Sequence, residues 1–132
     1  MKNDRTLDEE QIKAFAIQII NGIGFMHEQN HVHRDVKMGN VLMDREGYLK
    51  LCDFGMAIKL EEGQTSNENV GSRITWAPEV IEKKDYRMMP DWWSVGIIIY
   101  QLMMKGKTPF YIDQLKGKEG EINDDDFKKL SD

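Results

Sequence analysis

The sequence predicts a mainly helical α+β domain in which a short β-hairpin lies between two long helices. Three observations support this fold class. Apolar residues near the N-terminus recur at three- and four-residue spacing, which is the period of a helix with one buried face. Two short apolar runs flank a turn-forming stretch at residues 44–47, and a nearly unbroken apolar run follows residue 90.

The first helix is expected over residues 7–29. Thr6 followed by Glu9 forms a capping-box pattern, and the acidic residues 8–10 suit the positive end of the helix dipole. Its apolar stripe consists of Ile12, Phe15, Ala16, Ile19, Ile20, Ile23 and Met26. His27 and His31 lack the cysteine or carboxylate partners of a closed zinc site, so this helix is interpreted as structural.

The hairpin is expected from strands at residues 41–43 and 48–51, joined by an Asp-Arg-Glu-Gly turn. It would carry Asn40 at one end and Asp53 at the other, so that two oxygen ligands converge. Magnesium prefers such ligands and takes the rest from phosphate and water. The hairpin therefore predicts a metal site.

The second long helix begins at Pro90 and continues through Tyr100. It is apolar nearly all round, which predicts burial. The apolar run from Trp92 to Met104 is shorter than the roughly 20 residues that cross a bilayer, so no transmembrane segment is expected. Residues 116–126 are charged and contain glycine, and are expected to form a surface loop.

Composition limits the classes of function. The net charge of −5 and a pI near 5.2 argue against nucleic-acid binding, which needs a concentrated basic face. Cys52 is the single cysteine, which excludes an internal disulfide. With no signal peptide, the chain is expected to be cytoplasmic.

Three motifs then point to phosphoryl transfer. HRDVKMGN occupies residues 33–40, DFG residues 53–55 and APE residues 77–79, in the order of the protein-kinase signature set. The sequence resembles part of a protein kinase catalytic domain. Residues 1–6 are expected to be a disordered start, and residues 7–132 a partial domain, namely the C-terminal lobe without the N-terminal lobe and the last helices. No Gly-rich loop, strand lysine or partner glutamate is found, so the isolated chain is expected to be inactive.

The resemblance implies roles for the catalytic residues. Asp35 would be the base that accepts the proton of the substrate hydroxyl, and Lys37 would place a positive charge beside the transferred phosphoryl group. Lys37 at this spacing marks serine/threonine specificity. Asn40 and Asp53 would hold Mg²⁺, and Lys37, Asn40, Leu42 and Asp53 would bind ATP.

Other residues would support this site. The resemblance implies that Phe54 packs beneath the site beside His33 and that Gly55 gives the backbone freedom to turn. Asp91 would accept hydrogen bonds from the backbone of residues 33–40, called the catalytic loop below, near His33 and Arg34. Glu79 would form a buried salt bridge with an arginine that lies beyond this chain.

Residues 53–79 resemble the activation and substrate-docking loop of kinases, called the activation segment below. Arg34 is placed to pair with a phosphate on this segment, where this chain has Glu68. Two hypotheses remain open: Glu68 replaces the phosphate, or it is an ordinary exposed glutamate. Ser72 would bridge Asp35 and Lys37 through its hydroxyl, and Thr75 lies where relatives carry the aromatic residue of the docking pocket.

Within the protein kinases, the sequence most resembles the AGC group, and within that group the G-protein-coupled receptor kinases. The residues that carry this resemblance are 90–93, Thr108-Pro109-Phe110 and the charged stretch that follows. It implies transfer of the ATP γ-phosphate to Ser or Thr of a protein substrate, such as an activated receptor at the inner face of the plasma membrane. Two alternatives are a catalytically inactive, pseudokinase-like binding module that uses residues 106–132, and a metal-dependent hydrolase. Apolar faces that normally meet the missing parts predict aggregation or partner chains.

Overall fold

The computed structural model describes residues 7–110 of the 132-residue chain. In chain order its elements are α1 (Glu9–Glu28), β1 (His31–Val32), η1 (Met38–Asn40), β2 (Val41–Met43), β3 (Leu49–Leu51), β4 (Ile58–Lys59), η2 (Arg73–Thr75), α2 (Pro78–Ile81) and α3 (Met89–Met103). Helices and small antiparallel sheets agree with the predicted fold class. The expected disordered start at 1–6, the loop at 116–126, and most of the proposed interaction surface lie outside the described residues.

Helix α1 begins two residues later than the capping-box prediction placed it. The N-cap is Asp8: its Oδ1 accepts from the Gln11 amide at 2.8 Å, while the Gln11 Oε1 accepts from the Asp8 amide at 3.0 Å. The expectation of a Thr6–Glu9 box is wrong, because Asp8 is an equally good acceptor and has a glutamine three residues later. The helix also ends one residue earlier than expected, at Glu28.

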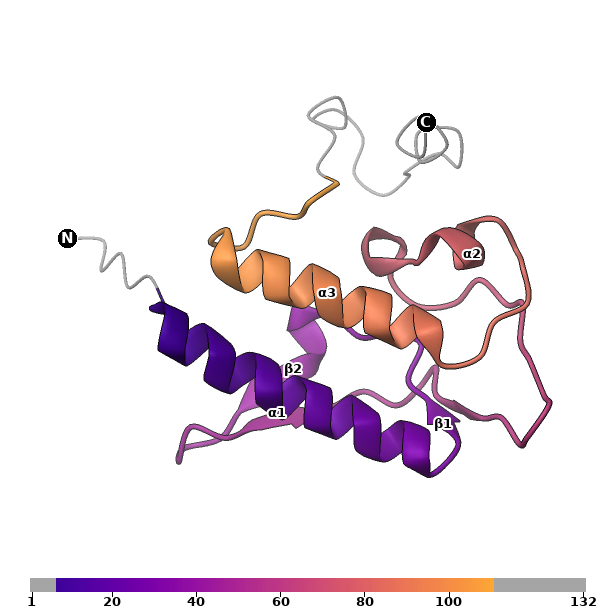
Figure 1. Ribbon diagram of the computed structural model, residues 1–132, viewed down its shortest axis with the longest axis horizontal. Helices are drawn as coiled ribbons and strands as arrows, with labels where there is room; N and C mark the ends of the chain where they lie inside the picture. Colours follow the sequence, from indigo (N-terminus) through magenta and orange to yellow (C-terminus); the bar gives the residue numbers. More distant parts are fainter. Residues whose placement is uncertain (1–6, 111–132) are drawn as a thin grey trace.

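The main core lies between α1 and α3, which run side by side in Figure 1. Ile19 and Ile23 of α1 pack with Val95 and Ile98 of α3. Val36 joins them from the loop after β1, with 1% of its surface exposed. Each such side chain contributes about 1.5–3 kcal/mol by burial, so this core fixes the loop that carries the HRD motif.

The predicted hairpin is present. Strands β2 and β3 pair antiparallel with Val41 opposite Leu51. Tyr48 lies in the turn rather than in the strand, because its amide donates to Asp44 Oδ1 at 2.9 Å. A second pair of strands, β1 and β4, was not predicted; it returns the chain to the end of α1, where the Leu60 amide donates to the Asn30 carbonyl at 2.8 Å.

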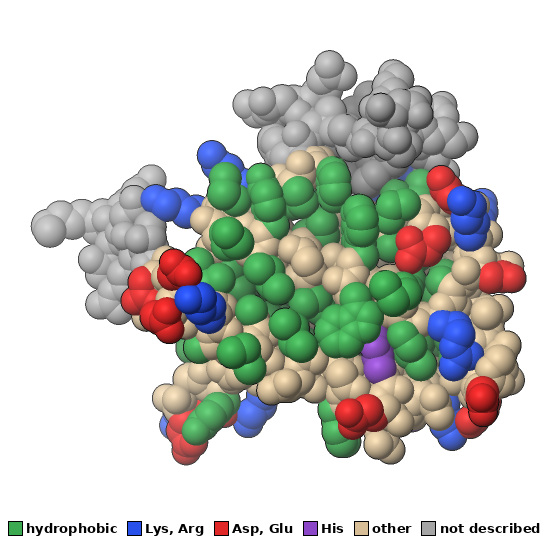
Figure 2. Space-filling model, in the orientation of Figure 1, with side chains coloured by type: hydrophobic (Ala, Val, Ile, Leu, Met, Phe, Trp, Pro, Cys, Tyr) green, Lys and Arg blue, Asp and Glu red, His purple; other side chains and the backbone are tan. Residues whose placement is uncertain are grey.

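Apolar side chains gather over α1 and α3 on the face shown in Figure 2. Met89 and Met103 of α3 are 66% and 62% exposed, and Ile17 of α1 is 57% exposed. The expectation that α3 is buried all round is therefore wrong within residues 7–110, where one face packs on the core and the other meets solvent. No helix in this range has the length and apolar character needed to span a membrane.

Candidate active site

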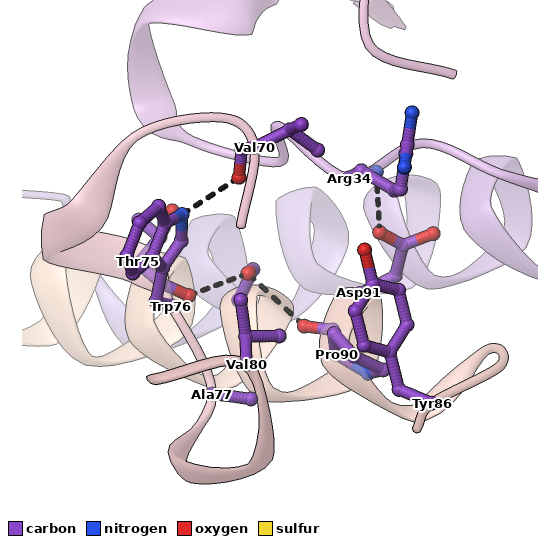
Figure 3. Close-up of a pocket in the computed structure, with 10 residues that line it drawn as sticks. Arg34, Val70, Thr75, Trp76, Ala77, Val80, Tyr86, Pro90 and Asp91 are labelled. Carbon is purple, nitrogen blue, oxygen red and sulfur yellow. Dashed lines mark hydrogen bonds between the residues drawn. The ribbon is translucent and has the colours of Figure 1, made fainter. Parts of the chain in front are cut away.

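The loop of the HRD motif is held in place by hydrogen bonds to Asp91, in the first turn of α3. Asp91 Oδ2 accepts from the His33 amide at 2.8 Å. Its Oδ1 accepts from the Arg34 amide at 2.9 Å, the contact drawn in Figure 3. The carboxylate is 1% exposed, and Arg34 has a φ of 67°, which a non-glycine residue adopts only when its surroundings hold it there. The predicted contact of Asp91 with the catalytic-loop backbone is present.

His27 is a residue of this site that sequence reasoning missed. Its Nε2 donates to Asp91 Oδ2 at 2.8 Å, and its ring meets Trp92 edge-on at 5.2 Å between centroids. Its position four residues after Ile23, on the buried stripe of α1, was the signal that could have found it. His31 instead donates to the Gln29 carbonyl at the surface.

The centre of the site is the carboxylate of Asp35, whose side chain is 11% exposed. Its Oδ1 accepts from the Ser72 amide at 3.0 Å, and Asn40 Nδ2 donates to its Oδ2 at 3.1 Å. Lys37 Nζ lies 3.7 Å from Oδ2 and donates to Ser72 Oγ at 2.8 Å. Ser72 thus bridges Asp35 and Lys37, but its contact with Asp35 is made by its backbone N–H rather than by the predicted hydroxyl.

Asn40 and Asp53 are brought together by the register of the hairpin. The Cys52 amide donates to the Asn40 carbonyl at 2.9 Å, which continues the pairing of β2 with β3 by one residue and places Asp53 next in line. The side-chain nitrogen of Asn40 donates to the Asp35 carbonyl and to Asp35 Oδ2, and no residue of 7–110 donates a hydrogen bond to Asn40 Oδ1. Asp53 is exposed, and its Oδ1 accepts from Gly55 at 3.3 Å.

The motif implies a metal ion, and these donors could supply part of its coordination. The described part of the chain holds no group of three or more His, Cys, Asp and Glu side chains fit to bind a metal. One carboxylate and one amide oxygen do suit Mg²⁺, which usually takes one or two protein ligands together with phosphate and water. The residues therefore fit Mg²⁺ carried by a nucleotide and do not form a complete protein cage.

The turn after Asp53 differs from the expectation. Asp53 itself adopts the left-handed conformation, with a φ of 58°, whereas Gly55 has no positive φ. The backbone freedom assigned to Gly55 is thus not what turns the chain; aspartate tolerates this region because its short polar side chain bonds locally. Phe54 does lie beside His33, with 5.3 Å between ring centroids. Burial beneath the site is incomplete, since Phe54 is 53% exposed.

The segment that follows lies directly on the catalytic loop. Arg34 donates from Nη1 to Glu68 Oε2 and from Nε to the Met56 carbonyl, both at 2.6 Å. Gly71 has a φ of 80°, and a Cβ there would lie 2.2 Å from the Arg34 carbonyl oxygen. Charge pairing and close backbone approach therefore hold the same two stretches together.

The protein kinase domain family model matches residues 1–131. The chain belongs to the protein kinase domain family. It is 38% identical over 114 residues to the serine/threonine-protein kinase AtPK1/AtPK6 of Arabidopsis thaliana, which covers 86% of this chain and 23% of that protein. The identity is 37% over 111 residues with the atypical protein kinase C of Drosophila melanogaster, covering 83% and 18% respectively.

A third relative is the human RAC-beta serine/threonine-protein kinase, 33% identical over 112 residues, covering 84% of this chain and 23% of that protein. The chain thus spans 18% to 23% of the length of these relatives. They confirm the resemblance to a serine/threonine kinase of the AGC group.

The end of the activation segment in this kinase domain lies against α3. Thr75 is 3% exposed; its Oγ1 donates to the Ser72 carbonyl at 3.0 Å, and its carbonyl accepts from Ser94 Oγ at 2.8 Å. Trp76 Nε1 donates to the Val70 carbonyl at 2.7 Å (Figure 3). Glu79, in α2, is half-buried and forms no ion pair within residues 7–110, so the buried salt bridge expected for it stays a prediction.

Proposed function

We propose that this chain supplies the catalytic and metal-binding loops of a serine/threonine protein kinase that transfers the γ-phosphate of ATP to a Ser or Thr hydroxyl. The observation that supports this most strongly is the cluster around Asp35. Ser72, Lys37 and Asn40 all meet this carboxylate or each other within 3.7 Å, and they come from two separate stretches of the chain, the loop of residues 33–40 and the activation segment. In a solvated loop these side chains would point into solvent rather than contact one another.

The arrangement assigns each group a part in the transfer. The substrate hydroxyl oxygen forms a bond to the γ-phosphorus while the bond between that phosphorus and the β–γ bridging oxygen breaks, and ADP leaves. Asp35 orients the hydroxyl and takes its proton. The Ser72 N–H and Asn40 Nδ2 hold the two oxygens of Asp35 in place, and Lys37 brings a positive charge to the same point.

Asn40 and Asp53 are the residues that would hold Mg²⁺ with the nucleotide. Bound Mg²⁺ would neutralise the negative charge of the phosphates. The hydrogen bond from Asn40 Nδ2 to Asp35 orients the side-chain amide of Asn40. Asn40 Oδ1 and the Asp53 carboxylate would then be the two oxygens that bind Mg²⁺. Leu42, 56% exposed on β2, would offer an apolar contact to the nucleotide.

Glu68 would replace a phosphate on the activation segment. The Arg34 side chain is 7% exposed, and a buried guanidinium requires an anionic or carbonyl partner. Glu68 supplies the anion at 2.6 Å without any modification. The segment would then be ordered in the unphosphorylated chain.

The test is titration calorimetry of the folded chain with ATP and Mg²⁺, with folding checked by circular dichroism. Asp53→Ala removes the proposed ligand, and Asp85→Ala is the matched control, since Asp85 is exposed in the connection between α2 and α3. Magnesium-dependent binding that Asp53→Ala abolishes and Asp85→Ala keeps is the expected result. A folded chain that binds no nucleotide would favour the alternative of a binding module derived from a kinase.

The narrower proposal is that the substrate is a receptor coupled to G proteins, met at the inner face of the plasma membrane. It rests on the sequence of residues 90–93 and on the charged stretch after Phe110, which lies outside the described residues. Because the isolated chain is expected to be inactive, binding is compared rather than phosphotransfer: the affinities of the folded chain for an activated receptor and for a soluble basic peptide of matched Ser and Thr content distinguish this substrate from a general one. Equal affinities for the two would reject the receptor assignment.

A further inference from the structure

We propose that Tyr86 and Arg87, in the connection between α2 and α3, are positioning residues that clamp the activation segment so that Glu68 reaches Arg34. We call these two residues the clamp. The proposal rests on the proposed kinase function, because it assigns a regulatory part of that same site. No motif pointed to either residue, and neither touches the groups that would react.

Tyr86 binds the segment through both its backbone and its side chain. Its amide and carbonyl pair with those of Ser66, at 2.8 and 3.0 Å, in an isolated antiparallel bridge. Its hydroxyl donates to the Glu68 carbonyl at 2.7 Å. The ring is 5% exposed and packs with Ala77 and Val80, so the hydroxyl is carried by a fixed part of a small core.

Glu68 is therefore held on both sides of its backbone. Its carbonyl accepts from the Tyr86 hydroxyl, and its amide donates to Ser66 Oγ at 3.3 Å. Its side chain reaches Arg34, which lines the same cavity as Tyr86 (Figure 3). A glutamate that is 63% exposed would otherwise sample many rotamers, so fixing its backbone limits the directions in which the carboxylate points.

Arg87 holds the earlier part of the segment. Its Nη1 donates to the Glu61 carbonyl at 2.8 Å and to the Gln64 carbonyl, and its Nη2 lies 3.4 Å from the Leu60 carbonyl. These carbonyls belong to a turn closed by the Gln64 amide on the Glu61 carbonyl, in which Gly63 has a φ of 79°. A planar guanidinium with five donors can serve several carbonyls at once.

The clamp is tied to the element that also supports the catalytic loop. Helix α3 begins at Met89, two residues after Arg87, and Asp91 in its first turn accepts the amides of His33 and Arg34. The start of α3 thus positions the catalytic loop through Asp91 and the activation segment through the clamp. The activation segment and the connection between α2 and α3 pair with each other on the side of the molecule that carries α2 (Figure 1).

Hydrogen exchange of single amides in the whole 132-residue chain, followed by NMR, tests the proposal without any nucleotide. Tyr86→Phe removes the hydroxyl and keeps the buried ring, and Arg87→Gln removes the guanidinium. The reporters are the amides of Glu68 and Ser72. The Glu68 amide donates to Ser66 Oγ inside the activation segment, and the Ser72 amide donates to Asp35 Oδ1, so its exchange reports contact between the activation segment and the catalytic loop. Matched controls are Tyr48→Phe and Arg45→Gln in the exposed hairpin.

Both clamp variants are expected to speed exchange at these two amides by about 5- to 10-fold, while the amides of α1 and α3 and both control variants stay unchanged. Unchanged exchange at Glu68 and Ser72 would overturn the proposal. So would acceleration in one clamp variant alone, or equal acceleration throughout α1 and α3, which would make the two residues part of the general core. Unchanged exchange rates would reject the clamp without bearing on ATP binding. A folded chain that binds no ATP would count against the proposed function without changing these exchange rates.

Discussion

His27 and Asp91, whose side chains are 10% and 1% exposed, form a pair with 2.8 Å between Nε2 and Oδ2, although 64 residues separate them in the chain. The same carboxylate accepts the backbone amides of His33 and Arg34. Three parts of the molecule, α1, the catalytic loop and α3, therefore meet at one side chain. An aspartate that is 1% exposed is tolerated there because three donors satisfy it.

His27→Phe should destabilise the chain, because it removes one of these donors while an aromatic ring still faces Trp92. Leaving a buried carboxylate oxygen one donor short costs about 1–3 kcal/mol in the free energy of unfolding. Urea denaturation followed by circular dichroism measures this loss. His31→Phe is the control: its hydrogen bond to the Gln29 carbonyl is at the surface, and the expected change is within about 0.5 kcal/mol. Equal losses for the two variants would contradict the role given to His27.

Gly71→Ala and Gly24→Ala should change stability in opposite directions. At Gly71 the new Cβ would lie 2.2 Å from the Arg34 carbonyl oxygen at a φ of 80°, so the loop must move or unfold locally, at a cost above about 1 kcal/mol. Gly24 lies inside α1 with nothing within 4 Å of its Cβ position, so alanine should stabilise the helix by about 0.5–1 kcal/mol. Thermal denaturation of both variants checks the two signs, and a stabilising Gly71→Ala would refute the close contact.

Hydrophobic period and turn composition predicted α1, the hairpin and α3, because each is defined by neighbours within one segment. The start of α1 was missed by two residues, since Thr6 and Asp8 both precede a residue able to complete a capping box. The sheet of β1 and β4 could not be predicted in this way. Each strand has two residues, and pairing His31 with Lys59 depends on how the intervening chain folds.

The motifs gave the site residues in outline, and the resemblance led to the contact of Asp91 with the loop amides. The finer contacts depend on backbone conformation that residue types do not specify. Ser72 meets Asp35 through its amide rather than its hydroxyl, and Asp53 rather than Gly55 takes the positive φ. His27 carries no motif, so only its place on the buried stripe of α1 distinguished it from a surface histidine.

Acidification should loosen the β2–β3 hairpin before the core unfolds. The Tyr48 amide, with further help from Lys50 and the Glu46 amide, holds the pKa of Asp44 below its usual range, against a smaller opposing effect of desolvation. A lowered pKa means that the unfolded chain binds the proton more readily. The stabilisation is therefore present above the ordinary aspartate range and is lost as pH falls through the lowered value.

NMR measures this loss as faster exchange of the Tyr48 amide relative to amides of α1, after correction for the intrinsic pH dependence of exchange. Asp44→Asn should remove the pH dependence of the ratio. A ratio that stays constant through the acidic range in the unsubstituted chain would show that Asp44 does not hold the turn.

Glu68→Gln should cost less than about 1 kcal/mol in the free energy of unfolding, because the carboxylate of Glu68 is 63% exposed and solvent screens its attraction to Arg34. Glu68→Lys should cost more, because it places a second positive charge beside a guanidinium that is 7% exposed. Urea denaturation at about 0.01 M and about 0.5 M salt distinguishes an effect of charge from an effect of side-chain shape. Screening at high salt should bring the free energy of unfolding of both variants closer to that of the unsubstituted chain. Glu62→Gln, at an exposed glutamate of the same segment, is the control and should show no salt-dependent loss. A loss for Glu68→Gln that is equal at both salt concentrations would mean that hydrogen-bond geometry, rather than negative charge, is what Glu68 contributes, and would argue against its acting as a replacement for phosphate.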